Sequence, residues 1–310
     1  MPSINAICKL VLSVPVDISV VLVTYNRLDL LKRALASVIA QRGVHWECFV
    51  INDHPETNRD VADICCAVGN ERIAFIECDE SRGANYARNL GLRLSKSVYV
   101  AFLDDDDVWC PKKLYEHHRA HLRSPEALMA FSGIKNVFDG VERRSEEVIA
   151  DSPAIQSYHA LLAQHLGGVS TTSCVSVARG EVLKIGGFDE TLPALQDWDL
   201  WYRLSKQSEF VYIPQALVEF HHHLGPRITL NVQKRKCAID AIIAKYPELT
   251  QGTFRRRILL VSYLNRARSE FYSKAYFAGF RSLILSLIRV RSQQDLRRIG
   301  REFLRCIFSC

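Results

Sequence analysis

The segment ISVVLVT, Ile18–Thr24, is a run of β-branched and other apolar residues interrupted only by Ser19. Such a run is typical of a strand that is buried on both faces, as in a parallel sheet covered by helices. Residues 31–39 then place apolar side chains about four positions apart, which favours an amphipathic helix. The first forty residues therefore predict a strand followed by a helix.

The same alternation continues along the chain. Short apolar runs at residues 49–51, 73–76 and 98–103 favour strands, and residues 61–68 and 83–94 between them favour helices. Strands separated by helices imply right-handed crossovers and parallel pairing. We therefore expect an α/β fold of Rossmann-like type, with a mixed, mainly parallel sheet and helices on both faces.

Ligands of such sheets bind outside the carboxyl ends of the strands. This rule selects the loops at residues 24–26, 52–53 and 104–107.

The rest of the chain is less regular. Polar residues 136–155 favour a turn or hairpin, residues 171–177 a strand, and residues 197–204 a helix. Beyond residue 232 the pattern is helical and rich in arginine, with no strand candidate. We expect a lead segment at 1–16, an α/β domain at 17–231 and a basic helical C-terminal region at 232–310.

Composition sets the broad class. The chain has 310 residues, of which 48% are hydrophobic and 24% charged, and this balance excludes a disordered or fibrous protein. The ten cysteines form no CxxC pair, which favours reduced thiols in a cytosolic protein. No apolar run is long enough to span a bilayer.

Charge is unevenly distributed. Residues 251–310 carry 13 Arg and Lys against 3 Asp and Glu, whereas the whole chain has a net charge of +6. A basic tail indicates an anionic partner, either membrane lipid or nucleic acid. No nucleic-acid motif accompanies the charge, so we expect peripheral contact with an anionic membrane, with packing of the tail on the domain as the alternative.

Four consecutive aspartates, residues 104–107, directly follow the apolar run at 98–103. Adjacent carboxylates repel one another, and a divalent ion such as Mg²⁺ or Mn²⁺ removes that cost. The alternative is a solvated acidic turn that caps a helix beginning near Pro111. The position at the end of a strand favours the metal.

Two further clusters carry possible chemistry. Asp197 lies beside Trp198, which could shield it from water, and this favours a general base; Asp189 and Asp199 suit helix capping instead. Three consecutive histidines, residues 221–223, cannot all face one metal from an extended strand, because alternate side chains point in opposite directions. A histidine and an arginine that contact phosphates are easier to build.

Seven motifs in this order resemble family 2 glycosyltransferases, in particular bacterial enzymes that build surface polysaccharides. The motifs are SVVLVTYNR, Asn52-Asp53, RGANYARNLG, FLDDDDVW, GGFDE, QDWDLW and HHHLGPRI. The likeness covers about residues 17–230 and implies the nucleotide-sugar-binding GT-A fold. The family usually has Glu-Asp where this chain has Gln196-Asp197, and often Asp-Asp where it has Asn52-Asp53.

The resemblance also implies site residues. Residues that would contact the donor are Thr24, Tyr25, Asn26, Asp53, Arg82, Arg88, Asp104, Asp105, His223 and Arg227. The first three would lie against the nucleoside, Asp53 would bind the base, and His223 and Arg227 would lie near the diphosphate. A Mn²⁺ or Mg²⁺ ion would be held by Asp104, Asp106 and His223. Asp197 falls on the family's catalytic base.

The implied activity is inverting transfer of a sugar, with a UDP-hexose as the expected donor. The expected acceptor is a glycan, with polyprenyl diphosphate as a candidate carrier, and the expected location is cytoplasmic, at the inner face of the cell membrane. A nucleotidyltransferase is a rival, although the loop after the first strand is not a glycine-rich phosphate loop. A non-catalytic nucleotide-sugar-binding subunit is a second rival, favoured by Gln196.

Overall fold

The computed structural model describes residues 15–138, 145–147, 171–222, 232–250, 260, 263, 267 and 276–287. The chain forms two compact units. The first comprises residues 1–158, 169–190 and 200–223, and the second comprises residues 159–168, 191–199 and 224–310. The domain limits expected from the sequence remain a prediction.

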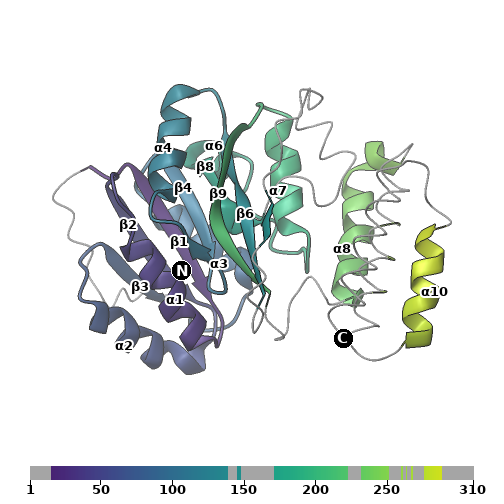
Figure 1. The fold of residues 1–310 in the computed structure, drawn as a ribbon, viewed down its shortest axis with the longest axis horizontal. Coiled ribbons are helices and arrows are strands. Elements are labelled where there is room, and N and C mark those ends of the chain that lie inside the picture. The colour runs from purple at the N-terminus through teal and green to yellow at the C-terminus, as the bar shows by residue number, and fades with distance from the viewer. Residues whose placement is uncertain are drawn as a thin grey trace. The chain divides into compact units, whose positions relative to one another are not determined.

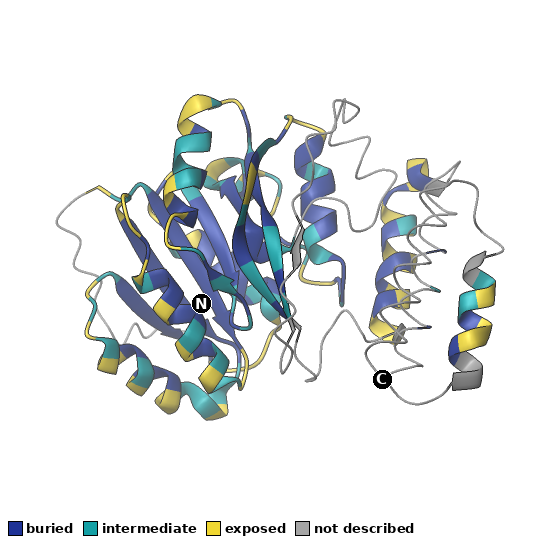
Figure 2. Cartoon of the chain, viewed as in Figure 1, coloured by how far each residue is buried: buried dark blue, intermediate teal, exposed yellow. Residues whose placement is uncertain are grey.

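The first unit contains one sheet, shown in Figure 1. Its parallel part has the strand order β3-β2-β1-β4. These strands are β1 (Ile18–Thr24), β2 (Trp46–Asn52), β3 (Ile73–Glu77) and β4 (Tyr99–Asp104). All seven residues of β1 and of β2 are buried, which agrees with the continuous apolar runs in the sequence. Figure 2 shows this burial along the strands.

Helices cover both faces of this parallel part. Leu22 packs in one core with α1 (Leu28–Ile39) and α2 (Asn58–Val68). Its neighbour Val21 points to the other face, because successive side chains of a strand alternate. There it packs closely against Gly91 of α3 (Ala84–Leu94), where an added Cβ would lie 2.4 Å from Val21 Cγ1.

Beyond β4 the sheet becomes mixed. β8 (Val175–Ala178) pairs antiparallel with both β4 and β6 (Met129–Phe138), and β6 pairs parallel with β9 (Val211–His222). β5 (Val108–Trp109) pairs antiparallel with Val218 and Glu219 of β9. The expected hairpin is present as the pairing of β6 with β7 (Ser145–Glu147). The strand expected at 171–177 begins instead as a 3₁₀ turn, η2 (Thr172–Cys174).

The remaining elements among the described residues are helical. They are η1 (Pro55–Thr57), α4 (Lys113–Arg123), α6 (Arg179–Lys184), α7 (Gln196–Ser205), α8 (Val232–Lys245), η4 (Pro247–Thr250) and α10 (Tyr276–Leu287). The described part of the C-terminal region is thus helical, as expected. In the residues that the structure describes, no helix combines the length and the apolar character needed to cross a bilayer.

In the second unit, the start of α7 is fixed to the end of α8. Asp199 is fully buried, and its Oδ1 accepts a hydrogen bond of 2.6 Å from the Tyr246 hydroxyl and pairs with Lys245 Nζ at 2.8 Å. Asp199 is the fourth residue of α7, and its side chain binds Lys245 at the end of α8 and Tyr246 directly after it, so the capping role considered for it is wrong.

Candidate functional site

The ends of three parallel strands bring polar residues to one edge of the sheet. Thr24 of β1 lies opposite Asn52 of β2, and Val23 lies opposite Asp104 of β4. The loops that follow these strands are the three selected from the sequence. The candidate site is therefore built where the topology of an open α/β sheet favours ligand binding.

The acidic loop after β4 alternates between buried and reachable side chains. Asp105 and Asp107 are 1% and 2% exposed, whereas the side chains of Asp104 and Asp106 are 30% and 20% exposed. The Asp107 amide donates to the Asp104 carbonyl at 3.2 Å, which closes a tight turn. Helix α4 has no side-chain cap at Lys112, so the helix-capping interpretation of this loop is wrong.

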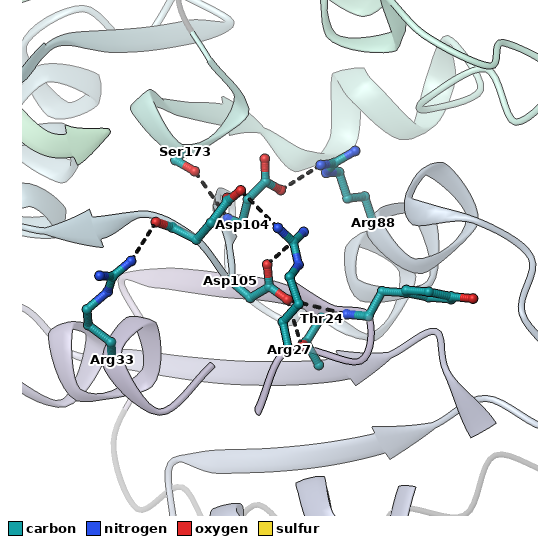
Figure 3. Close-up of polar contacts among 9 residues, drawn as sticks. Thr24, Arg27, Arg33, Arg88, Asp104, Asp105 and Ser173 are labelled. Carbon is teal, nitrogen blue, oxygen red and sulfur yellow. Dashed lines mark hydrogen bonds and ion pairs between the residues drawn. The ribbon is translucent and has the colours of Figure 1, made fainter. Parts of the chain in front are cut away.

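Two arginines neutralise the reachable aspartates (Figure 3). Arg88 Nη2 lies 2.6 Å from Asp104 Oδ1, and Arg27 Nη1 lies 3.0 Å from Asp106 Oδ2. A third arginine, Arg33, donates to the Asp106 backbone carbonyl at 3.1 Å. The acidic loop therefore carries its own counter-charges.

Asp105 is the buried anchor of the loop. Its Oδ2 accepts a hydrogen bond of 2.8 Å from the Thr24 hydroxyl and one of 3.3 Å from the Tyr25 amide, and its Oδ1 lies 3.0 Å from Arg27 Nη2. Burial raises the pKa of Asp105 to about 7, against the opposing effects of Arg27 and the Thr24 hydrogen bond. Asp105 thus joins the loop after β1 to the loop after β4.

Arg88 has spare hydrogen-bonding capacity in a buried position. Its side chain is 7% exposed, and its Nε and Nη1 atoms have no hydrogen-bond partner. Its guanidinium also lies 5.5 Å from the ring centre of Phe188. Buried donors of this kind are costly unless a ligand satisfies them, which fits the expected contact between Arg88 and the donor.

Asp53 organises the loop that precedes α3. Its carboxylate accepts hydrogen bonds of 2.8 Å from the Arg82 and Gly83 amides and one of 3.1 Å from the Ser81 hydroxyl. Gly83 has a φ of +91°, a conformation that favours glycine. Arg82 itself lies over the Tyr86 ring at 3.9 Å.

The loop after β1 presents an aromatic side chain. Tyr25 is 49% exposed and packs edge-to-face against His54, with ring centres 4.8 Å apart. Asn26 has a φ of +51°, which asparagine tolerates better than most residues. An exposed tyrosine beside a ring from the neighbouring loop offers a surface on which a nucleobase can stack.

The GGFDE and RNLG motifs are fixed to one another. The Asn89 amide donates to the Phe188 carbonyl at 2.9 Å and to Glu190 Oε1 at 2.8 Å, and its oxygen accepts from the Phe188 amide at 2.8 Å. Gly187 lies so close that an added Cβ would be 2.3 Å from Asn89 Oδ1. These contacts explain both the asparagine and the second glycine.

The site can be tested for fit to a divalent ion. Mg²⁺ prefers one or two carboxylates completed by phosphate oxygens and water. Asp104 and Asp106 supply two reachable carboxylates. Across the described residues, no three His, Cys, Asp or Glu side chains are grouped to hold a metal by themselves. The donor set therefore fits an ion whose coordination is completed by a diphosphate.

Three expected residues come from other motifs. Asp197 is the second residue of α7, in the second unit, where its Oδ1 accepts a hydrogen bond of 2.8 Å from the Trp198 amide. His223 and Arg227 lie outside the described residues.

The sequence interpretation missed three residues that hold the acidic loop: Arg27, Arg33 and Ser173. The Ser173 hydroxyl accepts a hydrogen bond of 3.1 Å from the Asp104 amide. Arg27 adjoins the Tyr25-Asn26 motif, and this position is the signal that could have revealed it.

This chain resembles known proteins in its family motifs, in its sequence and in its fold. The model of glycosyl transferase family 2 matches residues 19–177. A putative teichuronic acid biosynthesis glycosyltransferase, TuaG, from Bacillus subtilis (strain 168) is 36% identical over 98 residues, which are 31% of this chain and 38% of that protein. A glycosyltransferase of unassigned role from Haemophilus influenzae is 23% identical over 304 residues, 92% of this chain and 100% of that protein. The chain spans about a third of the length of other curated relatives, 36% and 35% in Rickettsia felis and Escherichia coli.

Solved structures give the same fold. Staphylococcus aureus TarS 1–349 in complex with UDP-GlcNAc has a TM-score of 0.54 and 12% identity, over 86% of this chain and 88% of that one. The mannosyltransferase PcManGT from Pyrobaculum calidifontis, in complex with GDP-Man and Mn²⁺, has a TM-score of 0.56 and 14% identity, over 98% and 84%. At these identities the likeness is one of fold, and it confirms the expected GT-A architecture.

Proposed function

The chain belongs to glycosyl transferase family 2, and from that membership we propose that it is an inverting, metal-dependent enzyme that transfers a hexose from a UDP-sugar to a glycan. The observation that carries the proposal is the pair of reachable carboxylates, Asp104 and Asp106, at the end of the central strand β4. Each carboxylate is paired with an arginine. Such pairs are expected where a metal ion takes the place of the arginines on the carboxylates and the arginines then bind the diphosphate.

The donor is proposed to bind across the loops at the carboxyl edge of the sheet. Tyr25 offers its exposed ring to the uracil, and Asp53 holds the backbone of the neighbouring loop. The buried Nε and Nη1 atoms of Arg88 are available to donate to a phosphate oxygen. The two structural neighbours carry different nucleotides, GDP-Man in PcManGT and UDP-GlcNAc in TarS. UDP is therefore preferred to GDP on the resemblance alone.

The reaction is proposed to be a single displacement at the anomeric carbon. Asp197 accepts the proton of the acceptor hydroxyl as that oxygen forms its bond to the anomeric carbon and the bond to the diphosphate breaks. Asp197 receives this role from the motif Gln196-Asp197. A Mn²⁺ or Mg²⁺ ion held by Asp104 and Asp106 would supply positive charge beside the departing diphosphate.

The acceptor is proposed to be a glycan in surface polysaccharide synthesis, carried on a polyprenyl diphosphate lipid. Relatives named for teichuronic acid and colanic acid biosynthesis support this class of acceptor. An acceptor of this kind places the enzyme in the cytoplasm, against the inner face of the cell membrane.

Helix α10 supports peripheral membrane contact. Phe280 and Ile284 are 50% and 57% exposed, and their spacing of four residues places them on one face of the helix. Arg281 is also exposed, within a region that carries 13 basic against 3 acidic residues. Apolar and basic side chains together favour an anionic lipid surface.

Vesicle sedimentation tests the membrane contact. The full chain is expected to sediment with phosphatidylglycerol vesicles and not with phosphatidylcholine vesicles. Replacing Phe280 and Ile284 together by glutamate is expected to reduce the bound fraction severalfold. Equal sedimentation of the double variant would refute a role for this face.

The donor class is tested by thermal shift with a panel of nucleotides and nucleotide sugars, in Mn²⁺, in Mg²⁺ and in chelator. We expect UDP and one UDP-hexose to raise the Tm in the presence of metal, and Asp106→Asn to lose the metal-dependent part. Stabilisation by GDP alone would make GDP, in place of UDP, the nucleotide of the proposed donor. No stabilisation by any compound in folded protein would refute nucleotide-sugar binding.

The alternative is a non-catalytic nucleotide-sugar-binding subunit. Gln196, where the family usually has glutamate, is the observation that favours it. Product formation with the donor selected above and a lipid-linked acceptor separates the two, because a binding subunit releases no UDP.

A further inference from the structure

Arg27 contacts two adjacent aspartates at once. Its Nη2 lies 3.0 Å from Asp105 Oδ1 and its Nη1 lies 3.0 Å from Asp106 Oδ2. Arg27 is also the residue that precedes α1, yet its side chain makes no capping hydrogen bond there. Its polar atoms are therefore directed at the acidic loop, and helix capping does not explain its presence.

The two aspartates differ in what they offer. Asp105 is 1% exposed and is already fixed by the Thr24 hydroxyl and the Tyr25 amide. Asp106 is 20% exposed and is one of the two carboxylates that a metal can reach. Arg27 therefore has one permanent partner and one partner that a ligand can take.

A divalent ion and a guanidinium compete for the same carboxylate. When the ion binds Asp106, the Nη1 side of Arg27 loses its anion, whereas the Nη2 side keeps Asp105. A partly buried guanidinium that loses a partner is costly unless another anion replaces it. A diphosphate that completes the metal's coordination brings such an anion to the same edge of the sheet.

We propose that Arg27 is the internal counter-ion of Asp106 in the ligand-free protein, and that it passes from Asp106 to the donor diphosphate when the divalent ion binds. This inference rests on the metal-dependent function proposed above. It assigns to Arg27 two effects of opposite sign: Arg27 weakens binding of the metal alone and strengthens binding of the nucleotide with the metal.

The test is the pair of affinities in Arg27→Gln, which removes the charge and keeps a polar side chain. Binding of Mn²⁺ alone, followed by electron paramagnetic resonance, is expected to tighten on the order of tenfold, because a cation next to the ion is lost. Binding of UDP at saturating Mn²⁺, followed by calorimetry, is expected to weaken by about tenfold through loss of a charged hydrogen bond. GDP replaces UDP if the thermal-shift panel selects it.

Arg33→Gln is the matched control. It removes the same charge from the same loop region, but Arg33 donates to the Asp106 backbone carbonyl and not to the carboxylate. We expect it to change the Mn²⁺ affinity by less than about threefold. Equal tightening in the Arg27 and Arg33 variants would show a general charge effect and overturn the exchange.

Other outcomes are also decisive. Weakening of both affinities in Arg27→Gln would make Arg27 a structural residue, and tightening of Mn²⁺ with unchanged UDP affinity would refute its transfer to the diphosphate. If Arg27→Gln does not fold, Arg27→Lys is measured instead; it keeps the charge but not the two-pronged contact, and the same signs are expected with smaller size. If neither the wild-type chain nor any variant binds Mn²⁺, with or without nucleotide, the proposed metal site itself is refuted. If metal and nucleotide bind normally and the variants show none of these shifts in affinity, only the exchange is refuted.

Discussion

Asn89 is expected to be a main determinant of stability in the first unit. Asn89→Ala removes the partners of both the Phe188 amide and the Phe188 carbonyl, and Phe188 is 1% exposed. Each buried backbone group left without a partner costs about 1–3 kcal/mol, and the Glu190 carboxylate, which is exposed, can turn to water. We therefore expect a loss of about 3 kcal/mol.

The assay is thermal unfolding followed by circular dichroism. For a unit of this size, a loss of that magnitude lowers the Tm by about 6–12 °C. Asn70→Ala is the matched control: Asn70 is half-exposed, and its oxygen accepts from the Arg72 amide at 3.1 Å, so a change below about 1 kcal/mol is expected. Asn89→Asp tests the donating nitrogen of the Asn89 side chain apart from its accepting oxygen. It keeps the hydrogen bond from the Phe188 amide and places a negative charge beside Glu190. An Asn89→Ala Tm that matches the Asn70→Ala Tm would refute the reasoning.

Three further predictions concern the proposed base, the pH dependence of stability and the packing of α3 on β1. Asp197→Asn is expected to abolish transfer while the Tm rise caused by the nucleotide stays within about 1 °C of wild type; near-normal turnover would remove Asp197 as the base. Burial lowers the pKa of Lys113 from 10.5 to about 7, so between these values the folded chain binds fewer protons than the unfolded chain and stability rises with pH. Lys113→Met should remove that slope from urea titrations at pH 7 to 10, and an unchanged slope would contradict it. Gly91→Ala is expected to cost about 1–3 kcal/mol of unfolding free energy because its Cβ would meet Val21, whereas Gly180→Ala, with open space around it, should change it by less than about 1 kcal/mol; equal denaturation midpoints would show that β1 and α3 can separate.

The parallel part of the fold could be predicted from the sequence. Strands such as Ile18–Thr24 are continuous apolar runs, and a buried parallel strand needs no other signal. β9 was missed as a long strand because Pro214 lies inside it and cannot donate to the ladder. The pairing with β6 accommodates this residue by a shift of register: Ser132 pairs with Ile213, and Gly133 pairs with Ala216. A bulge of this kind depends on the partner strand and leaves no local pattern.

Site residues that lie within a sequence motif could be predicted. Residues that matter only because they contact a motif residue could not. The run of aspartates was visible, but its alternation between buried and reachable side chains depends on the turn that follows β4. Arg27 adjoins the Tyr25-Asn26 motif, but an arginine in a loop is usually solvated, so its position alone does not show which carboxylates it contacts. Its role needs the pairing of β1 with β4, which brings Val23 opposite Asp104.

The acidic loop is short and is tied to the sheet at both ends, by β4 before it and by the pairing of β5 with β9 after it. The Trp109 indole adds a bond of 2.9 Å to the Ser173 carbonyl, and the Cys110 amide adds one of 2.9 Å to the Leu217 carbonyl. Its backbone thus has little freedom to rearrange, and the exchange proposed for Arg27 needs only a rotation of that side chain. Rotamer changes of partly exposed side chains take picoseconds to nanoseconds, whereas loop closure takes microseconds or longer. Loading of this edge with metal is therefore expected to be limited by diffusion and dehydration of the ion, and the slow step of turnover to lie elsewhere in the protein.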